Sequence, residues 1–107
     1  MLDTTELTAA AERFADRLRA APQSRLQRGA AGEALALARE LSVMAQRAEE
    51  PGRQPRIMPE AGVFVVADQV LVAANDLAEA FRSVSVSPRA VDDAVALVRA
   101  AAERSGL

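Results

Sequence analysis

The stretch "GVFVVADQVLVAANDLAEAF", Gly62 to Phe81, decides the fold because two different structures fit it. At about 100° per residue, its polar side chains fall within an arc of about 140°, as they do in an amphipathic helix. The spacing predicts one helix from Glu60 to about Ser83. Its apolar face alternates steps of four and three residues, through Val63, Ala67, Val70, Ala74, Leu77 and Phe81.

The alternative is a short β-hairpin over residues 63–73, followed by a helix capped by Asn75, which makes the chain α+β. The β-branched residues favour it, although β propensity is a weak guide. Its turn at Ala67, Asp68 and Gln69 has neither glycine nor Asn-Gly. A lone two-stranded ribbon is also marginally stable in water. The helix is therefore the preferred interpretation, with the hairpin as the runner-up.

Two further helical segments precede this stretch. The first segment begins at Asp3, which together with Glu6 three residues later resembles a capping box. Pro22 ends this segment or opens the next one. The next segment has Ser24 as a candidate cap, and its best-supported part runs from about Glu33 to Glu49, because Gly29 and Gly32 each weaken its first turns by about 1 kcal/mol relative to alanine. The same four-three spacing runs through Leu7, Ala11, Phe14, Leu18 and Ala21, and then through Ala30, Ala34, Leu37, Leu41, Met44 and Ala48.

A linker and one more helix complete the pattern. The segment Glu49–Glu60 contains three prolines and a glycine, which predicts a linker. Ser87 and Pro88 then fit the cap and first position of a helix that ends at Ser105-Gly106. Its apolar face is Val91, Val95, Val98 and Ala102.

Four amphipathic segments with one spacing predict an all-α fold, an antiparallel four-helix bundle that forms a single domain over residues 1–107. We expect the helices to alternate in direction, up-down-up-down. The apolar faces are rich in alanine, so helices can approach closely, but each alanine buries little area. The sequence predicts an alanine-rich core of modest stability.

The residue types that are missing restrict the chemistry. The chain has no His, Cys, Trp, Tyr or Lys, and all 13 basic residues are arginine. The common general base near neutral pH, the common zinc ligands, the thiol nucleophile and the Schiff-base amine are therefore missing. We expect no enzyme, no catalytic residues and no cofactor. A GC-rich, bacterial genome is the simplest explanation for the arginine and alanine bias.

Acidic side chains occur in small groups: Asp92-Asp93, Glu49-Glu50, and the set Asp68, Asp76 and Glu79. Helical di-metal sites combine such residues with histidine, which this chain lacks. Solvated helix faces are the preferred interpretation, so no metal site is predicted. The net charge of −2 and the absence of aromatic residues among the arginines give no sign of nucleic-acid binding.

Three apolar residues of the opening stretch, Phe64, Val65 and Val72, fall on or in its polar arc. Exposed apolar side chains that gather in a patch mark contacts with partners. These residues predict a protein–protein interface, and a homodimer is the simplest assembly that uses it. The preferred functional hypothesis is a small, non-catalytic interaction or oligomerisation module.

The alternative hypothesis is a regulatory protein that binds an anion or a phosphate ligand. An up-down-up-down bundle gathers Arg25, Arg28, Arg82 and Arg89 at one end, near Arg17 and Arg19. Arginine side chains and helix N-termini both favour anions. The nearby carboxylates and the ordinary preference for cations at helix C-termini argue against such a site.

The location of the protein is predicted from what the sequence lacks. The N-terminal residues show no basic region followed by an apolar run, so no signal peptide is expected. The most apolar window contains Asp68 and Gln69 and is shorter than the roughly 20 residues that a spanning helix needs. With no cysteine, there is also no sign of an oxidising compartment. We expect a cytoplasmic protein with no membrane association.

Overall fold

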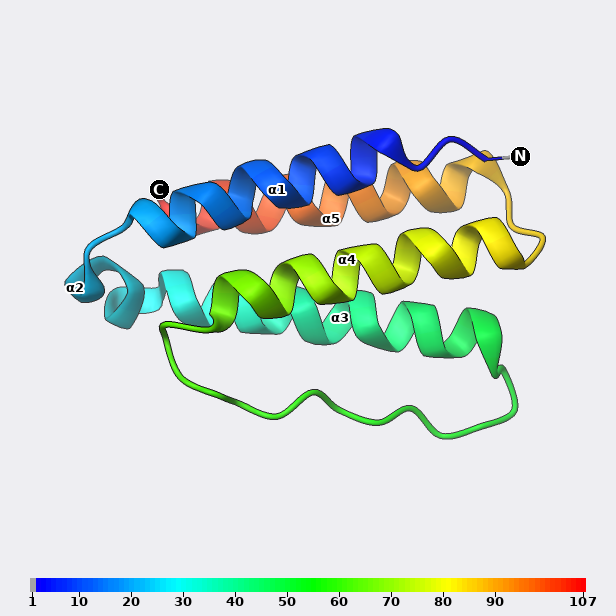
Figure 1. Cartoon of the computed structure of the whole chain (residues 1–107), viewed down its shortest axis with the longest axis horizontal. Helices are drawn as coiled ribbons and strands as arrows, with labels where there is room; N and C mark the ends of the chain where they lie inside the picture. Colours follow the sequence, from blue (N-terminus) through cyan, green and yellow to red (C-terminus); the bar gives the residue numbers. More distant parts are fainter. Residues whose placement is uncertain (1) are drawn as a thin grey trace.

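The structure, a computed structural model, describes residues 2–107 and is a bundle of four long helices (Figure 1). They are α1 (Thr5–Ala20), α3 (Ala31–Glu49), α4 (Val66–Ser83) and α5 (Pro88–Ser105). A single helical turn, α2 (Gln23–Arg25), and a π-helical turn (Leu26–Ala30) connect α1 to α3. Residues 2–107 contain no strand, so the predicted all-α four-helix bundle is confirmed and the hairpin alternative is wrong.

The core includes the residues that the four-three spacing selects, together with neighbouring residues on the same helices, most of them alanines. Every residue of those four apolar faces is buried or partly buried against the core. About half of the buried apolar residues are alanine, which confirms the alanine-rich core. The largest side chains that are fully buried are Phe14, Leu7, Leu18, Leu41, Leu77, Val70 and Val98.

The path of the chain differs from the up-down-up-down order that we expected. Figure 1 shows α1 and α5 running in one direction and α3 and α4 in the other, so α3 and α4 are parallel. The segment 50–65 returns along the bundle before α4 begins. At up to about 3.3 Å per residue, it easily spans α3, whose 19 residues measure about 28 Å. The long connection reverses the direction of α4.

Side chains from two helices hold the segment 50–65 in place. From α3, Arg39 donates a hydrogen bond to the carbonyl of Met58 (2.8 Å), and Gln46 both donates to the carbonyl of Arg56 and accepts from its N–H (2.8 Å each). From α4, Gln69 donates to the carbonyl of Pro59 (2.9 Å). The segment is not helical, as the linker prediction stated, but these bonds fix it against α3 and α4.

Helix α4 begins later than the sequence predicts. Gly62 adopts a positive φ of 100°, which L-residues with a side chain rarely adopt, and a turn follows at Val63–Val65. The N–H of Val65 donates to the carbonyl of Gly62 (3.4 Å), and the helix starts only at Val66. The predicted start at Glu60 is therefore wrong, and Phe64 and Val65 lie in a turn rather than within the helix.

The ends of the other helices follow the expected signals in part: Thr4 rather than Asp3 is the N-cap of α1, and neither Thr4 nor Ser87 makes a side-chain cap bond. The Asp3 carboxylate accepts a hydrogen bond from the Thr5 N–H (2.9 Å), and hydrogen bonding from Thr5 lowers the pKa of Asp3. Glu6 does not complete the capping box, because it pairs with Arg99 on α5. Pro88 is the first residue of α5, and Gly106 follows its last residue, as predicted.

Two glycines near the start of α3 provide a matched test of this fold. Gly29 has φ +131°, a backbone conformation that strains any other residue, whereas Gly32 lies within α3. A Cβ added at either position has no neighbour within 4 Å, so only the backbone distinguishes the two sites. We expect Gly29→Ala to lower the free energy of unfolding by about 1–3 kcal/mol and Gly32→Ala to raise it by about 0.5–1 kcal/mol. Urea denaturation followed by circular dichroism measures both. Equal effects at the two positions would contradict the kink at Gly29.

Candidate functional site

The large apolar side chains that remain exposed in residues 2–107 all belong to one short part of the chain. They are Ile57 (62% exposed), Phe64 (76%), Val65 (37%) and Val72 (54%). Three of them are the residues that the sequence placed in the polar arc of the opening stretch. Ile57 was missed, because it stands alone in a proline-rich linker where no spacing distinguishes an apolar contact from a solvated residue.

The spacing along α4 shows which way this apolar surface faces. Val65, Gln69, Val72, Asp76 and Glu79 follow one another at steps of four and three, so they share one face of the helix. Gln69 binds the carbonyl of Pro59. That face of α4 is therefore turned toward the segment 50–65, and Val72 lies on it between Gln69 and Asp76. Val65, in the turn, extends the face toward the start of α4.

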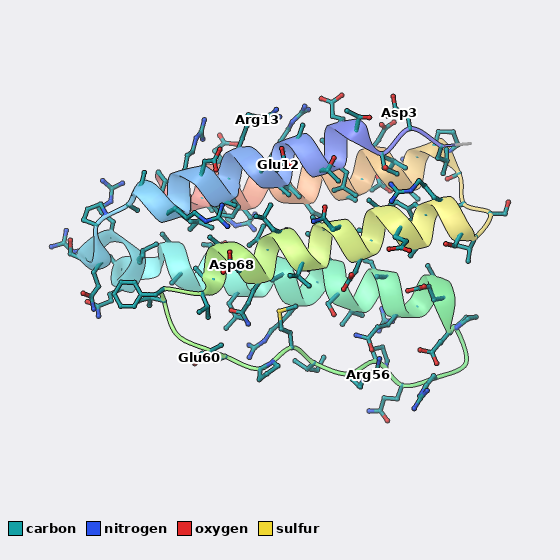
Figure 2. All side chains as sticks on the ribbon, in the orientation of Figure 1. Asp3, Glu12, Arg13, Arg56, Glu60 and Asp68 are labelled. Carbon is teal, nitrogen blue, oxygen red and sulfur yellow. The ribbon has the colours of Figure 1, made fainter. Side chains whose placement is uncertain are left out.

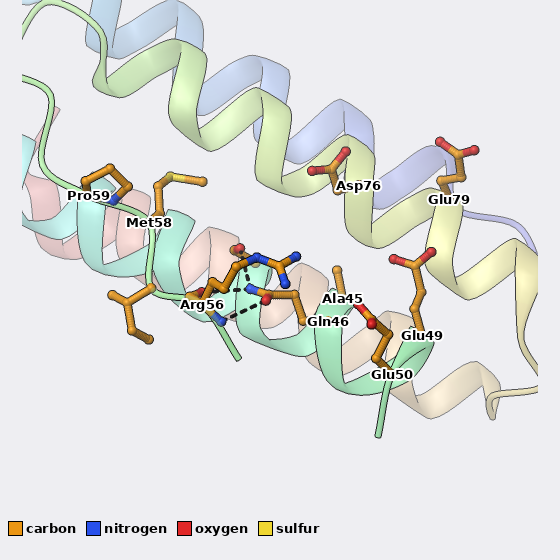
Figure 3. Close-up of a pocket in the computed structure, with 11 residues that line it drawn as sticks. Ala45, Gln46, Glu49, Glu50, Arg56, Met58, Pro59, Asp76 and Glu79 are labelled. Atoms are coloured by element: carbon orange, nitrogen blue, oxygen red, sulfur yellow. Dashed lines mark hydrogen bonds between the residues drawn. The ribbon is translucent and has the colours of Figure 1, made fainter. Parts of the chain in front are cut away.

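A groove of about 530 Å³ lies between the segment 50–65, α3 and α4 (Figure 3). Ile57, Met58 and Pro59 line it from the segment 50–65, and Asp76 and Glu79 line it from α4. Because Asp76 is one turn from Val72 on the same face, the exposed apolar residues Ile57 and Val72 lie beside the same groove.

Four carboxylates line this groove, two from the end of α3 and two from α4: Glu49, Glu50, Asp76 and Glu79. In Figure 3, Glu49 points from α3 toward α4, where Asp76 and Glu79 lie on the facing helix. Arg56 is the one basic residue in the lining. The groove therefore combines an apolar part with an acidic part.

Little within the structure neutralises this acidic part. Glu50 pairs with Arg53 (3.0 Å), and among residues 2–107 neither Arg56 nor the carboxylates of Glu49, Asp76 and Glu79 make an ion pair. The structure thus joins the predicted pair Glu49-Glu50 to two members of the predicted set Asp68, Asp76 and Glu79. Asp68, the third member, lies elsewhere and pairs with Arg19 of α1 (2.6 Å).

The apolar surface continues beyond the groove toward the start of α4. A smaller pocket of about 180 Å³ lies between α3 and the turn that precedes α4. Leu35, Val63 and Val66 line it, together with Glu60 and Gln69. Since Gln69 also binds Pro59 in the segment 50–65, the pocket and the groove adjoin at this residue. We call the whole surface, from the turn at Val63–Val65 to Glu79, the α4 strip.

The expected cluster of four arginines does not form. Because α4 runs parallel to α3, Arg82 and Arg89 lie at the end of the bundle where α4 ends, whereas Arg25 and Arg28 lie at the opposite end (Figure 1). Arg82 donates to the Thr4 hydroxyl (2.7 Å), and Arg25 donates to the carbonyl of Gly106 (2.6 Å). The prediction that these arginines share one end is wrong.

A different group of arginines meets on the far side of the bundle. Arg13 and Arg17 of α1 and Arg99 of α5 line a groove of about 490 Å³ with Glu103. Figure 2 shows Arg13 at the edge of the molecule opposite Arg56 and Glu60. The sequence did not indicate this grouping, because it depends on α1 and α5 packing side by side. The bundle therefore has a groove with three arginines between α1 and α5 and an acidic groove between α3 and α4.

The described part of the chain, residues 2–107, has no set of three or more acidic side chains placed to hold a metal ion. Within the same residues, no helix has both the length and the apolar character needed to cross a bilayer. No family model, curated protein or solved structure matches this chain.

Proposed function

We propose that the chain is a small, non-catalytic protein–protein interaction module that contacts its partner through the α4 strip. The observation that carries the proposal is the distribution of exposed apolar side chains. In residues 2–107 all four large ones fall within residues 57–72. Val65 and Val72 share one face of α4 and Ile57 lines the groove beside that face, whereas Phe64 lines a separate pocket with Leu18 and Leu26. Scattered exposed apolar residues are common on protein surfaces, but residues that share one face are typical of a contact surface.

The chemistry of the groove supports binding rather than catalysis. Its carboxylates are exposed to solvent, and the chain contributes no histidine, cysteine or lysine to work with them. Carboxylates that act as general acids near neutral pH are usually buried beside apolar groups, which raise their pKa. The anion-binding alternative has lost its basis, because its four arginines lie at two ends of the bundle.

Apolar contact through this strip supports only weak association by itself. Burying a valine or phenylalanine side chain contributes about 1.5–3 kcal/mol, and these side chains are already partly covered. Association costs an estimated 4–15 kcal/mol in lost freedom of motion. A second copy of the chain is the simplest partner, and we expect the isolated protein to form a weak homodimer at high concentration.

The proposal is tested by measuring the mass of the protein in solution with light scattering over a range of concentrations. Refractive index must report the concentration, because the chain has neither Trp nor Tyr. We expect the mass of the wild type to rise with concentration, and Val72→Glu to abolish the rise, because a buried carboxylate has no partner.

Ala96→Glu is the matched control, since Ala96 is an exposed residue of α5 that lines a groove between α1 and α5, away from the α4 strip. It adds the same charge and should leave the association unchanged. If both Val65→Glu and Val72→Glu associate as the wild type does, the α4 strip is not the contact surface.

A further inference from the structure

We infer that the natural occupant of the α4 strip is a basic amphipathic segment of a different protein, apolar at one end and rich in arginine or lysine at the other. The inference rests on the proposed function, because it names the chemistry of the partner that this same surface binds. It is carried by the order of the side chains along the strip and by their charge.

The strip changes character along its length. Its first part is mainly apolar: Val65 is exposed in the turn, and Val63 and Leu35 line the adjoining pocket together with one carboxylate residue, Glu60. Its middle has Val72 on α4 and Ile57 on the segment 50–65, both more than half exposed. Its last part is the acidic part of the groove. A partner that matches this order has apolar side chains first and basic side chains after them.

The negative charge of the acidic part of the strip determines the sign of the charge on the partner. Glu49, Asp76 and Glu79 make no ion pair among residues 2–107, and all three line one groove, Glu49 from α3 and the other two from α4 (Figure 3). Like charges along one groove repel, and a cationic side chain bound in the groove relieves the repulsion. Arginine is the best suited, because its planar guanidinium forms paired hydrogen bonds with carboxylates.

The length of the strip sets the size of the segment. Val65 and Glu79 are 14 positions apart in a helical register, which corresponds to about 21 Å at 1.5 Å per residue. A helix of about 14 residues covers this distance, as does an extended segment of about six or seven residues. The partner therefore needs to supply only one short element, laid along α4 and the segment 50–65.

A second copy of this chain fits the strip less well than such a segment does. The arginines Arg13, Arg17 and Arg99 lie on the other side of the bundle. Contacts between opposite sides of identical chains generate an open filament rather than a closed dimer. A two-fold pair centred on Val72 brings the apolar part of one strip against the acidic part of the other. Neither arrangement places basic side chains against Glu49, Asp76 and Glu79 in a closed assembly.

The experiment uses the whole protein and two fluorescein-labelled peptides of 14 residues. Both have leucines at steps of three and four in their first half. The second half of one peptide contains four arginines, and glutamates replace them in the other. Fluorescence anisotropy measures the binding of each. We expect the arginine peptide to bind about tenfold more tightly near 0.1 M salt, since several exposed ion pairs of modest strength combine. This preference should largely disappear near 1 M salt, where charges are screened over about 3 Å.

Two variants assign the preference to the groove. Asp76→Asn with Glu79→Gln removes two carboxylates at nearly constant shape and should remove most of the preference for arginine. Glu12→Gln with Glu103→Gln is the matched control, because it removes two exposed carboxylates of α1 and α5 that make no ion pair among residues 2–107. The control should bind both peptides as the wild type does.

The outcomes separate this inference from the proposed function. If the two peptides bind equally and Val72→Ser weakens both, the α4 strip is a contact surface but its partner is not basic, and the inference is wrong. If Val72→Ser changes neither peptide's binding nor the self-association, the proposed function is wrong as well. If the protein is a tight dimer that the arginine peptide does not dissociate, the occupant of the strip is a second copy.

Discussion

Leu77→Ala is expected to lower the free energy of unfolding. Replacing a buried leucine by alanine costs about 2–5 kcal/mol, and we expect the loss here to lie in the upper part of that range. Leu77 is fully buried in α4, and five other buried residues of that helix are alanines: Ala67, Ala73, Ala74, Ala78 and Ala80. Alanine side chains have no rotamers with which to fill a cavity, so the space left by the leucine stays open. For a small domain, whose total stability is about 5–15 kcal/mol, this is a large fraction.

Urea denaturation followed by circular dichroism at 222 nm is the appropriate measurement, because the chain has no Trp or Tyr to report by fluorescence. Val72→Ala is the matched control on the same helix. Val72 is more than half exposed, so its replacement should change the free energy of unfolding by no more than about 0.5 kcal/mol. A loss below about 1 kcal/mol for Leu77→Ala would contradict the placement of this side chain in a closely packed core.

The second large effect is expected from a substitution in the opposite direction, Ala74→Leu. Ala74 is fully buried in α4, the helix that makes its most extensive contact with α3. Helices pack at axial distances of about 8–10 Å, and small side chains at the contact permit the shorter distances. A leucine at this position has to push neighbouring helices apart, which costs about 1–3 kcal/mol or more.

Ala36→Leu is the control for this substitution, since Ala36 is an exposed residue within α3. Leucine and alanine have similar helix propensities, so the control should change the stability little. Both variants are measured by the same urea denaturation. If Ala74→Leu is as stable as the wild type, the core around α4 contains more free space than the burial of its alanines indicates.

The prediction of the helices succeeded because a helix is specified by neighbours three and four residues apart. The apolar steps through Leu7, Phe14 and Leu18, for example, mark the buried face of α1 whatever packs against it. The prediction failed at the start of α4, where Val63 continues the same spacing but lies outside the helix. Gly62, with its positive φ, and the hydrogen bonds that hold the segment 50–65 keep the chain out of the helix before Val66. The spacing of apolar residues does not reveal either effect.

Part of the candidate surface could be predicted from the same spacing. Phe64, Val65 and Val72 fall outside the apolar arc, and all three are exposed. The acidic groove could not be predicted from the sequence, because Glu49 and Asp76 come from different helices that meet only in the folded chain. The error over Arg25 and Arg82 has the same origin, since their distance depends on the direction of α4 relative to α3.

The amino-acid sequence alone therefore determined the four helices, their buried faces and three of the four large apolar residues left exposed. These properties arise from interactions within a few turns of one helix. The tertiary structure alone decided that α3 and α4 run in parallel, that four carboxylates line one groove and that the arginines are divided between the ends. The physical reason is that a connection as long as the segment 50–65 can either turn back at once or cross the bundle. Packing between helices, together with the hydrogen bonds of Arg39, Gln46 and Gln69, selects the second path.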